Sequence, residues 1–297
     1  MPFLRPIPFV LLAGSACTSS KVETEDDTGL EPTSGVFDVL TYNVHGLPSA
    51  ITGDDTPGRM QAIAPRLTAH RIIGLQEDFD ADNHAILTEE APHLTQITFD
   101  QRLDGRFYGS GLSILADYEE VEVRNTHYST CHGTTDAASD CLASKGFQAL
   151  RVQLGTATLD IYNTHLEAGG GDEDNAARQV QVDDLIASLQ GWSQDQAVVF
   201  TGDFNLRETD PEDLPQIDQL LEEAGLERTC WALDCDTPNH IDKILFRSSP
   251  EVTLVPTLWA NIDSEFRDES DTPLSDHPPI AAAFAWHASS GSQPQDP

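Results

Sequence analysis

Strand-like apolar segments alternate with helical patterns from residue 36 onward, and this alternation limits the folds open to the chain. Residues 36–44 (VFDVLTYNV) are apolar and β-branched, as in a buried strand, whereas residues 57–70 place apolar side chains at helical spacing. Strand-like segments outnumber helical ones, and some follow each other directly. A purely parallel sheet would need a crossover after each strand. We therefore predict a layered α/β sandwich of mixed sheets, in one domain from about residue 36 to 288.

Short polar clusters follow six of the strand-like segments. The clusters are Asn43 to His45, Gln76 with Glu77, Asn163 to His165, Gly202 to Asn205, Ile241 with Asp242, and Ser275 to His277. A single Asn or Asp after a strand is usually a turn residue. Six clusters rich in carboxylate, amide and imidazole, at the strand ends where α/β folds place ligands, predict a functional site. His45 is a weaker candidate, because we expect its side chain to point away along the strand.

The motifs YNV, LQE, NTHL, GDFN, IDKILF and SDHPPI occur along the chain in this order. Each motif is weak alone, but the ordered set resembles the endonuclease/exonuclease/phosphatase superfamily typified by deoxyribonuclease I. The resemblance covers nearly the whole domain. It implies a four-layered α/β/β/α sandwich with two mixed β-sheets, and a metal-dependent phosphoric ester hydrolase of the phosphodiesterase type.

The resemblance also implies a site for a hard divalent cation. Glu77 in LQE would be the principal ligand of Mg²⁺, with Mn²⁺ or Ca²⁺ as alternatives, since such cations bind carboxylate oxygens and Mg²⁺ keeps several waters. Asn43 would hold the phosphate or support that metal. Asp276 would coordinate metal or hold its loop.

Five further residues would act on the phosphate group if the resemblance holds. His277 would be the general base that activates water, and Asp242 would accept its other N–H and fix the tautomer. His165 would stabilise the developing charge or protonate the leaving oxygen. Asp203 would orient the water or assist the metal, and Asn205 would donate to a phosphoryl oxygen. Catalysis would then consist of positioning and electrostatic stabilisation of the transition state.

Residues 131–152 (CHGTTDAASDCLASKGFQALRV) bear on the substrate. A Lys145-Gly146 pair that precedes an apolar strand and follows a cysteine-bounded loop is similar to the secreted sphingomyelinase branch, which implies that Lys145 lines the site near the phosphate. The alternative is that Lys145 merely begins a strand. The chain has 50 acidic and 16 basic residues, a net charge of −34. This charge disfavours nucleic acid without excluding it, and disfavours a zwitterionic choline lipid less.

We therefore favour hydrolysis of a phospholipid such as sphingomyelin by in-line attack of a His-activated water. An extracellular nuclease or a phosphomonoesterase on the same fold is the main alternative. A non-catalytic binding module is a further one, which the intact set of polar clusters disfavours. The preferred partner is thus a phospholipid head group, with membrane association through a possible N-terminal lipid anchor.

Residues 1–17 (MPFLRPIPFVLLAGSAC) have the basic start, apolar run and small residues of an export signal peptide. Cys17 follows residues that are similar to a bacterial lipoprotein cleavage box, so lipidation of Cys17 and ordinary secretion both stay open. Residues 18–35 are predicted to be a flexible tether, and residues 289–297 a disordered tail. The expected product is a secreted protein or an outer-surface lipoprotein of a bacterium.

Four cysteines remain if Cys17 belongs to the export signal, and export implies an oxidising compartment. Their close spacings suggest Cys131–Cys141 and Cys230–Cys235 bridges, although four cysteines allow three pairings. A zinc site is the alternative. The nine and four intervening residues do not match the common zinc pattern.

Overall fold

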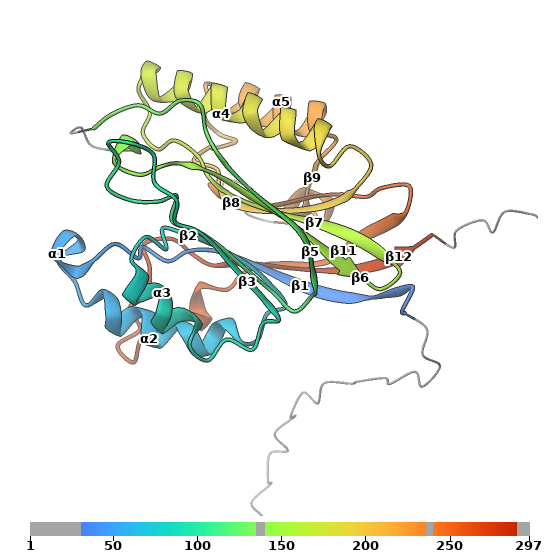
Figure 1. Ribbon diagram of the computed structural model, residues 1–297, viewed down its shortest axis with the longest axis horizontal. Coiled ribbons are helices and arrows are strands. Elements are labelled where there is room, and N and C mark those ends of the chain that lie inside the picture. Colours follow the sequence, from blue (N-terminus) through green and yellow to red (C-terminus); the bar gives the residue numbers. More distant parts are fainter. Residues whose placement is uncertain (1–30, 135–139, 236–239, 290–297) are drawn as a thin grey trace, which may run out of the picture. The chain divides into compact units, whose positions relative to one another are not determined.

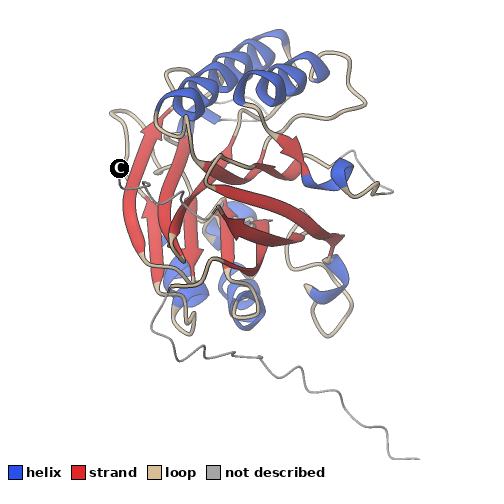
Figure 2. Cartoon of the chain, turned by 90° about the vertical axis from the view of Figure 1, so that its right-hand side faces the viewer, coloured by secondary structure: helices blue, strands red, loops and turns tan. Residues whose placement is uncertain are grey.

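The computed structural model describes residues 31–134, 140–235 and 240–289, which from Pro32 onward belong to one compact unit. Two six-stranded sheets face each other, with helices outside both (Figure 1). Figure 2 shows the same order of layers, with helices on either side of the strands. The predicted α/β/β/α sandwich of two mixed sheets is confirmed. The predicted signal peptide with Cys17, residues 18–30 of the tether and residues 290–297 of the tail lie outside the described residues.

The first sheet has the strand order β11-β12-β1-β2-β4-β3. Its strands are β1 (Ser34–Asn43), β2 (Ile72–Gln76), β3 (Thr95–Phe99), β4 (Leu112–Ala116), β11 (Val252–Asn261) and β12 (Ile280–Ala288). β1 and β2 run parallel, and the other neighbours are antiparallel. β1 begins at Ser34, two residues before the predicted start of the domain at residue 36. The domain boundaries at residues 36 and 288 stay a prediction.

The second sheet has the strand order β5-β6-β7-β8-β10-β9. Its strands are β5 (Glu120–His127), β6 (Gly146–Leu154), β7 (Ala157–His165), β8 (Ala197–Asp203), β9 (Glu227–Arg228) and β10 (Asp242–Arg247). β7 and β8 are its parallel pair, and the remaining neighbours are antiparallel. Each sheet thus contains one parallel pair, and the two pairs carry most of the polar clusters at their ends.

Helices α2 (Thr56–Leu67) and α3 (Ala81–Thr88) pack on the first sheet, and α4 (Asp172–Gly191) and α5 (Leu214–Ala224) on the second. The short helices are α1 (Ser49–Thr52), α6 (Thr229–Ala232) and the 3-10 turns Asp140–Leu142 and Asp263–Glu265. The Asp55 side chain caps α2 by accepting the Gly58 N–H. Among the described residues, no helix combines the length and apolar character needed to cross a bilayer.

The space between the sheets is filled mainly by apolar side chains, among them Val39, Ile72, Ile114, Ile161, Val199 and Phe284. Burial of this surface is the main stabilising contribution to the sandwich. Toward the carboxyl ends of the parallel strands, the filling becomes polar. Gln76 Nε2 donates to Asn163 Oδ1 at 2.7 Å and to Thr41 Oγ1 at 3.1 Å, and Thr201 Oγ1 also contacts Asn163 Oδ1. We call Thr41, Gln76, Asn163 and Thr201 the polar seam.

Both predicted disulfides are present. Cys131 is bonded to Cys141, with Cα atoms 5.5 Å apart, and Cys230 to Cys235, with Cα atoms 5.1 Å apart. The first bridge closes the loop between β5 and β6, and the second joins Cys230 in α6 to Cys235 just after that helix. The pairing of neighbouring cysteines is therefore confirmed, and the zinc alternative is wrong.

Candidate active site

Strand pairing in the first sheet brings one half of the predicted site together. Because β1 and β2 are parallel, Asn43 at the end of β1 and Glu77 just after β2 lie at the same edge. β12 runs antiparallel to β1, so the loop that precedes β12 reaches this edge too. The Ser275 hydroxyl donates to the Asn43 carbonyl at 2.7 Å and fixes the loop that carries Asp276 and His277.

The second sheet contributes the other half by the same geometry. The parallel strands β7 and β8 end with His165 and Asp203 as registered neighbours. β10 runs antiparallel to β8, so its first residue, Asp242, is registered with Asp203. Asn205 follows two residues after β8. The Asn205 amide group donates to the Leu166 carbonyl at 3.1 Å, and the Asn205 backbone N–H donates to Asp203 Oδ1 at 3.0 Å.

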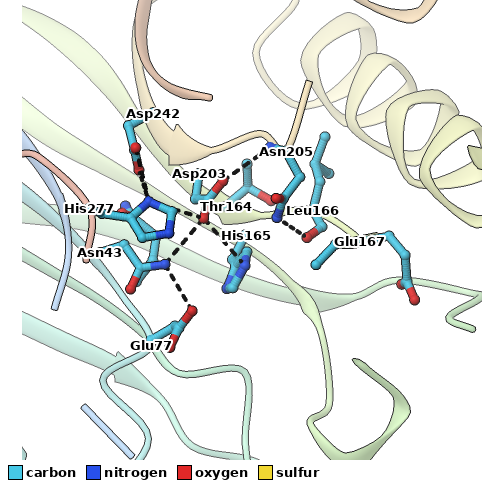
Figure 3. A network of polar contacts seen from close by, with 12 residues as sticks. Asn43, Glu77, Thr164, His165, Leu166, Glu167, Asp203, Asn205, Asp242 and His277 are labelled. Atoms are coloured by element: carbon cyan, nitrogen blue, oxygen red, sulfur yellow. Dashed lines mark hydrogen bonds and ion pairs between the residues drawn. The ribbon is translucent and has the colours of Figure 1, made fainter. Parts of the chain in front are cut away.

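Asn43 joins the two halves (Figure 3). Its side-chain nitrogen donates to Glu77 Oε1 at 2.9 Å and to Asp203 Oδ2 at 3.1 Å. Glu77 belongs to the first sheet and Asp203 to the second, so one fully buried amide connects carboxylates from both. The position of Asn43 therefore fixes the separation of the two carboxylates.

His277 and Asp242 form a hydrogen-bonded pair. His277 Nδ1 lies 3.0 Å from Asp242 Oδ2 and 3.1 Å from Oδ1, and 3.7 Å from Asp203 Oδ2. Burial would lower the pKa of His277, but the hydrogen bond that its ring donates to Asp242 and the charges of Asp242, Asp203 and Asp276 outweigh it and raise this pKa to about 10. Because Nδ1 faces Asp242, Nε2 is the ring nitrogen free to exchange a proton with water.

His165 stands on the other side of Asp203 from His277 (Figure 3). Its Nε2 lies 3.5 Å from Asp203 Oδ2, and its buried Nδ1 has no hydrogen-bond partner within the described part of the chain. Burial lowers the pKa of His165, and the charge of nearby Lys145 lowers it further. The two imidazoles therefore differ in environment: one is beside a carboxylate pair and the other beside an ammonium group.

Lys145 lies immediately before β6 and is buried beside the site. Its ammonium nitrogen lies 2.6 Å from Asp140 Oδ1 and donates to the Leu166 carbonyl at 2.7 Å. Lys145 lines the same pocket as Glu77 and His165. Asp140 was not expected in the site. Its position beside the bridged Cys141 was the sequence signal that could have indicated it.

Three residues of the site have left-handed backbone conformations. The φ angles are 49° at His45, 57° at Glu77 and 49° at Asn205. Asn and His adopt this region more often than most residues, whereas Glu does so at a cost, and residues strained in this way cluster at functional sites. The Gly46 N–H donates to the Glu77 carbonyl at 2.9 Å and holds the two turns together.

His45 lies in the site, and the expectation that its side chain points away along the strand was wrong. β1 ends at Asn43, and the left-handed backbone at His45 removes the alternation that the argument assumed. His45 Nδ1 lies 3.6 Å from Glu77 Oε2 and 3.4 Å from Asp276 Oδ1. Its backbone N–H donates to Asn43 Oδ1 at 3.1 Å. His45 thus stands between two residues that were predicted as metal ligands.

Oxygen ligands for a hard cation lie on both sides of Asn43. Glu77 lines an open pocket, with its Oε2 directed toward His45. On the other side, ligand atoms of Asp203, Asp242 and His277 lie within 4.8 Å of one another. Carboxylate oxygens are the ligands that Mg²⁺ prefers, so Glu77, Asp203 and Asp242 fit the expected cation, whereas the imidazole nitrogen of His277 does not. The side chain of Asp276 is 63% exposed.

Residues 41–230 match the family model described as Endonuclease/Exonuclease/phosphatase family 2. A sphingomyelinase of Mycobacterium tuberculosis strain H37Rv is 31% identical over 279 residues, which cover 88% of this chain and 55% of the relative. A sphingomyelinase of Mycobacterium bovis gives the same figures. The chain thus spans about half the length of the curated relatives that it matches.

Solved structures share the fold at low sequence identity. Sphingomyelinase C from Streptomyces griseocarneus has a TM-score of 0.63 and 19% identity, over 84% of this chain and 99% of that one. A Staphylococcus aureus beta toxin mutant with bound magnesium ions has a TM-score of 0.63 and 14% identity, over 84% and 99% of the two chains. The sequence match over residues 41–230 and the shared fold agree: the chain belongs to the Endonuclease/Exonuclease/phosphatase family 2.

Proposed function

We propose that this chain is a divalent-cation-dependent phosphodiesterase that hydrolyses a choline phospholipid such as sphingomyelin. The observation that carries the proposal is the continuous polar network from Glu77 through Asn43 and Asp203 to His277 and Asp242. A network of this kind offers a cation site and a proton acceptor on one phosphate-sized surface. The identity of 31% to the mycobacterial sphingomyelinases supports the choice of substrate.

In this proposal His277 accepts a proton from the attacking water through Nε2, and Asp242 stabilises the imidazolium that forms. The water oxygen bonds to phosphorus, and the bond between phosphorus and the leaving alcohol oxygen breaks. His165, whose lowered pKa favours the neutral ring, stabilises the charge that develops on the leaving oxygen, and the departing alkoxide takes its proton from water. The opposite placement of the two histidines around Asp203 supports this division of roles.

Other residues of the chain would stabilise the charge that develops on the phosphoryl oxygens. The second N–H of the Asn205 amide and the positive charge of Lys145 lie on the His165 side of the network. Groups held in place before the reaction stabilise a transition state without reorganising. A divalent cation held by Glu77 and the neighbouring carboxylates would neutralise phosphoryl charge and offset the charges that raise the pKa of His277.

The proposal includes an exported protein, either secreted or held on the outer surface through Cys17. The two disulfides support this location, because disulfides persist in oxidising compartments. The net charge of −34 supports a zwitterionic lipid over a polyanion, because nucleic acid would approach against a repulsive field.

The test is a parallel assay of the purified full chain on sphingomyelin, phosphatidylcholine, plasmid DNA and p-nitrophenyl phosphate. Each substrate is supplied with Mg²⁺, Mn²⁺, Ca²⁺ or excess chelator, and His277→Ala serves as the control for contaminating activity. We expect hydrolysis of sphingomyelin that the chelator abolishes. Faster nicking of plasmid DNA than hydrolysis of sphingomyelin would contradict the substrate, and full activity in chelator would contradict the cation.

A further inference from the structure

An apolar pocket opens beside the phosphate site. It shares Glu77 and His165 with that site, and its remaining walls include Leu47, Ile51, Phe79, Tyr108, Leu142 and Ala143. The pocket has a volume of about 310 Å³. Among the described residues of this lining, Lys145 carries the one ammonium group, and it is paired with Asp140 at 2.6 Å. The described walls therefore offer mainly apolar surface, with this ammonium group already beside a carboxylate.

Several chain segments build the pocket, and they are tied to one another. The backbone N–H groups of Phe107 and Tyr108 both donate to the Leu142 carbonyl, at 2.8 and 3.2 Å. The Phe79 and Tyr108 rings pack with centroids 5.7 Å apart. Ile51 comes from α1, which Figure 1 shows at the end of the sandwich that carries the site. Its side chain is 56% exposed, although it is a large apolar group next to a polar centre.

The side of the phosphate on which the pocket lies follows from the two histidines. The pocket is lined by His165 but by neither His277 nor Asp242. His277 and His165 approach Asp203 Oδ2 from opposite sides, at 3.7 and 3.5 Å. In phosphoryl transfer, the attacking and leaving oxygens lie roughly in line across the phosphorus. With the attacking water at His277, the pocket lies on the leaving side.

We infer that this pocket binds the leaving alcohol of the substrate, and that Ile51 and the other apolar wall residues select an alcohol with a long hydrocarbon portion. The inference rests on the proposed function, because it takes His277 as the base. A nucleotide leaving group would place its polar base and sugar against walls that are mainly apolar, and would bring a further phosphate toward Asp140 and Glu77. A lipid alcohol instead buries its hydrocarbon against these walls, which is favourable in proportion to the apolar area removed from water.

The test compares substrates that share phosphocholine and differ only in the leaving alcohol. We would measure kcat/KM on glycerophosphocholine and on monomeric alkyl phosphocholines of increasing chain length, for the wild type and for Ile51→Ser. Wild-type kcat/KM should rise with chain length. Ile51→Ser should lower it about tenfold on the longest chain, which corresponds to about 1.4 kcal/mol, and less than twofold on glycerophosphocholine, because only the long alcohol contacts this side chain.

Val36→Ser is the matched control. Val36 is 70% exposed and lies near the start of β1, at the opposite end of that strand from Asn43. Its replacement removes an exposed β-branched apolar side chain as Ile51→Ser does, and should leave every kcat/KM unchanged. Leu142→Ala provides a second variant within the pocket wall. Like Ile51→Ser, it should reduce the rise of kcat/KM with chain length.

The outcomes distinguish a failure of the proposed function from a failure of the pocket assignment alone. If the wild type cleaves neither sphingomyelin nor any of these phosphodiesters with any divalent cation, the proposed function fails and the pocket assignment fails with it. If it cleaves sphingomyelin but none of the alkyl phosphocholines, only the pocket assignment is overturned. If cleavage occurs but Ile51→Ser lowers kcat/KM equally on all substrates, only the pocket assignment is overturned. The same holds if the products are choline and an alkyl phosphate, because the head group would then be the leaving group.

Discussion

Replacing Lys145 with Met should destabilise the folded protein by about 3–5 kcal/mol, because it leaves Asp140 as a buried charge without its partner. The side chains of Lys145 and Asp140 are only 3% and 6% exposed, and their charged atoms lie 2.6 Å apart. The same substitution removes the donor to the Leu166 carbonyl. Met fills a volume close to that of the Lys stem, so loss of the charge is the main change.

The structure places the expected cost toward the lower end of this range. Asp140 Oδ2 still accepts the Ala168 N–H at 2.9 Å after the substitution, so one oxygen keeps a partner. Glu167, in contrast, increases the expected cost of the substitution. Burial raises the pKa of Glu167 to about 7, the charge of Asp140 contributes to this rise, and Lys145 opposes it. Without Lys145, two buried carboxyl groups lie close together, and we expect a cost of about 3 kcal/mol.

The measurement is urea unfolding followed by circular dichroism, with disulfides intact. The control is Arg124→Met, which breaks the Arg124–Glu122 pair at 3.0 Å on the exposed surface and should cost less than about 1 kcal/mol. The double variant Lys145→Met/Asp140→Asn should cost less than the sum of the two single variants, because the charges interact. A loss below about 1 kcal/mol for Lys145→Met would refute the reasoning, because it would mean that the Lys145–Asp140 pair contributes no more than an ion pair exposed to solvent.

Three further predictions concern two residues of the site, His277 and Glu77, and the buried carboxyl group of Glu167 near Lys145. His277→Ala should lower turnover roughly a thousandfold, and the double variant with Asp242→Asn should be little worse, because the two residues share one task; losses that simply multiply would contradict the pair. Glu77→Gln should abolish cation-dependent activity and the stabilisation by added Mg²⁺ in thermal unfolding, while the cation-free protein unfolds at a nearly unchanged temperature. Burial and Asp140 raise the pKa of Glu167 from 4.5 to about 7, so the stability that this group contributes is present below pH 4.5 and is lost as the pH rises through about 7. Glu167→Gln should therefore flatten the dependence of the unfolding temperature on pH across this range, and an unchanged slope would show that Glu167 ionises normally.

The polar clusters at strand ends could be predicted because they are local in sequence. Asn43, Glu77, His165, Asp203 and Asp242 each lie at or next to a terminus of the strand that was predicted for them. That they converge follows from the parallel pairing of β1 with β2 and of β7 with β8. Local patterns indicate strands but not their partners, so the sequence predicted a mixed sandwich without its strand order.

The contacts that the sequence analysis missed depend on backbone conformation or on distant partners. His45 enters the site because its φ angle is 49°. His adopts this region more often than most residues, but that preference does not indicate which His will adopt it. Asp140 and Glu167 flank Lys145 from loops on either side of the β6–β7 hairpin. Their importance comes from burial, which a strongly acidic sequence conceals, because 48 other acidic residues look equally plausible as surface groups.

The polar seam determines how the two sheets align. Apolar side chains would pack nearly as well after a small slide of one sheet over the other, because hydrophobic contact has no direction. Gln76 Nε2 to Asn163 Oδ1 at 2.7 Å and Asn163 Nδ2 to the Leu75 carbonyl at 2.8 Å allow no such freedom. A slide of one residue, about 3.3 Å, exceeds the length of either bond. The seam therefore selects the single alignment in which Glu77 and Asp203 both reach the amide of Asn43, and neither sheet alone contains a complete site.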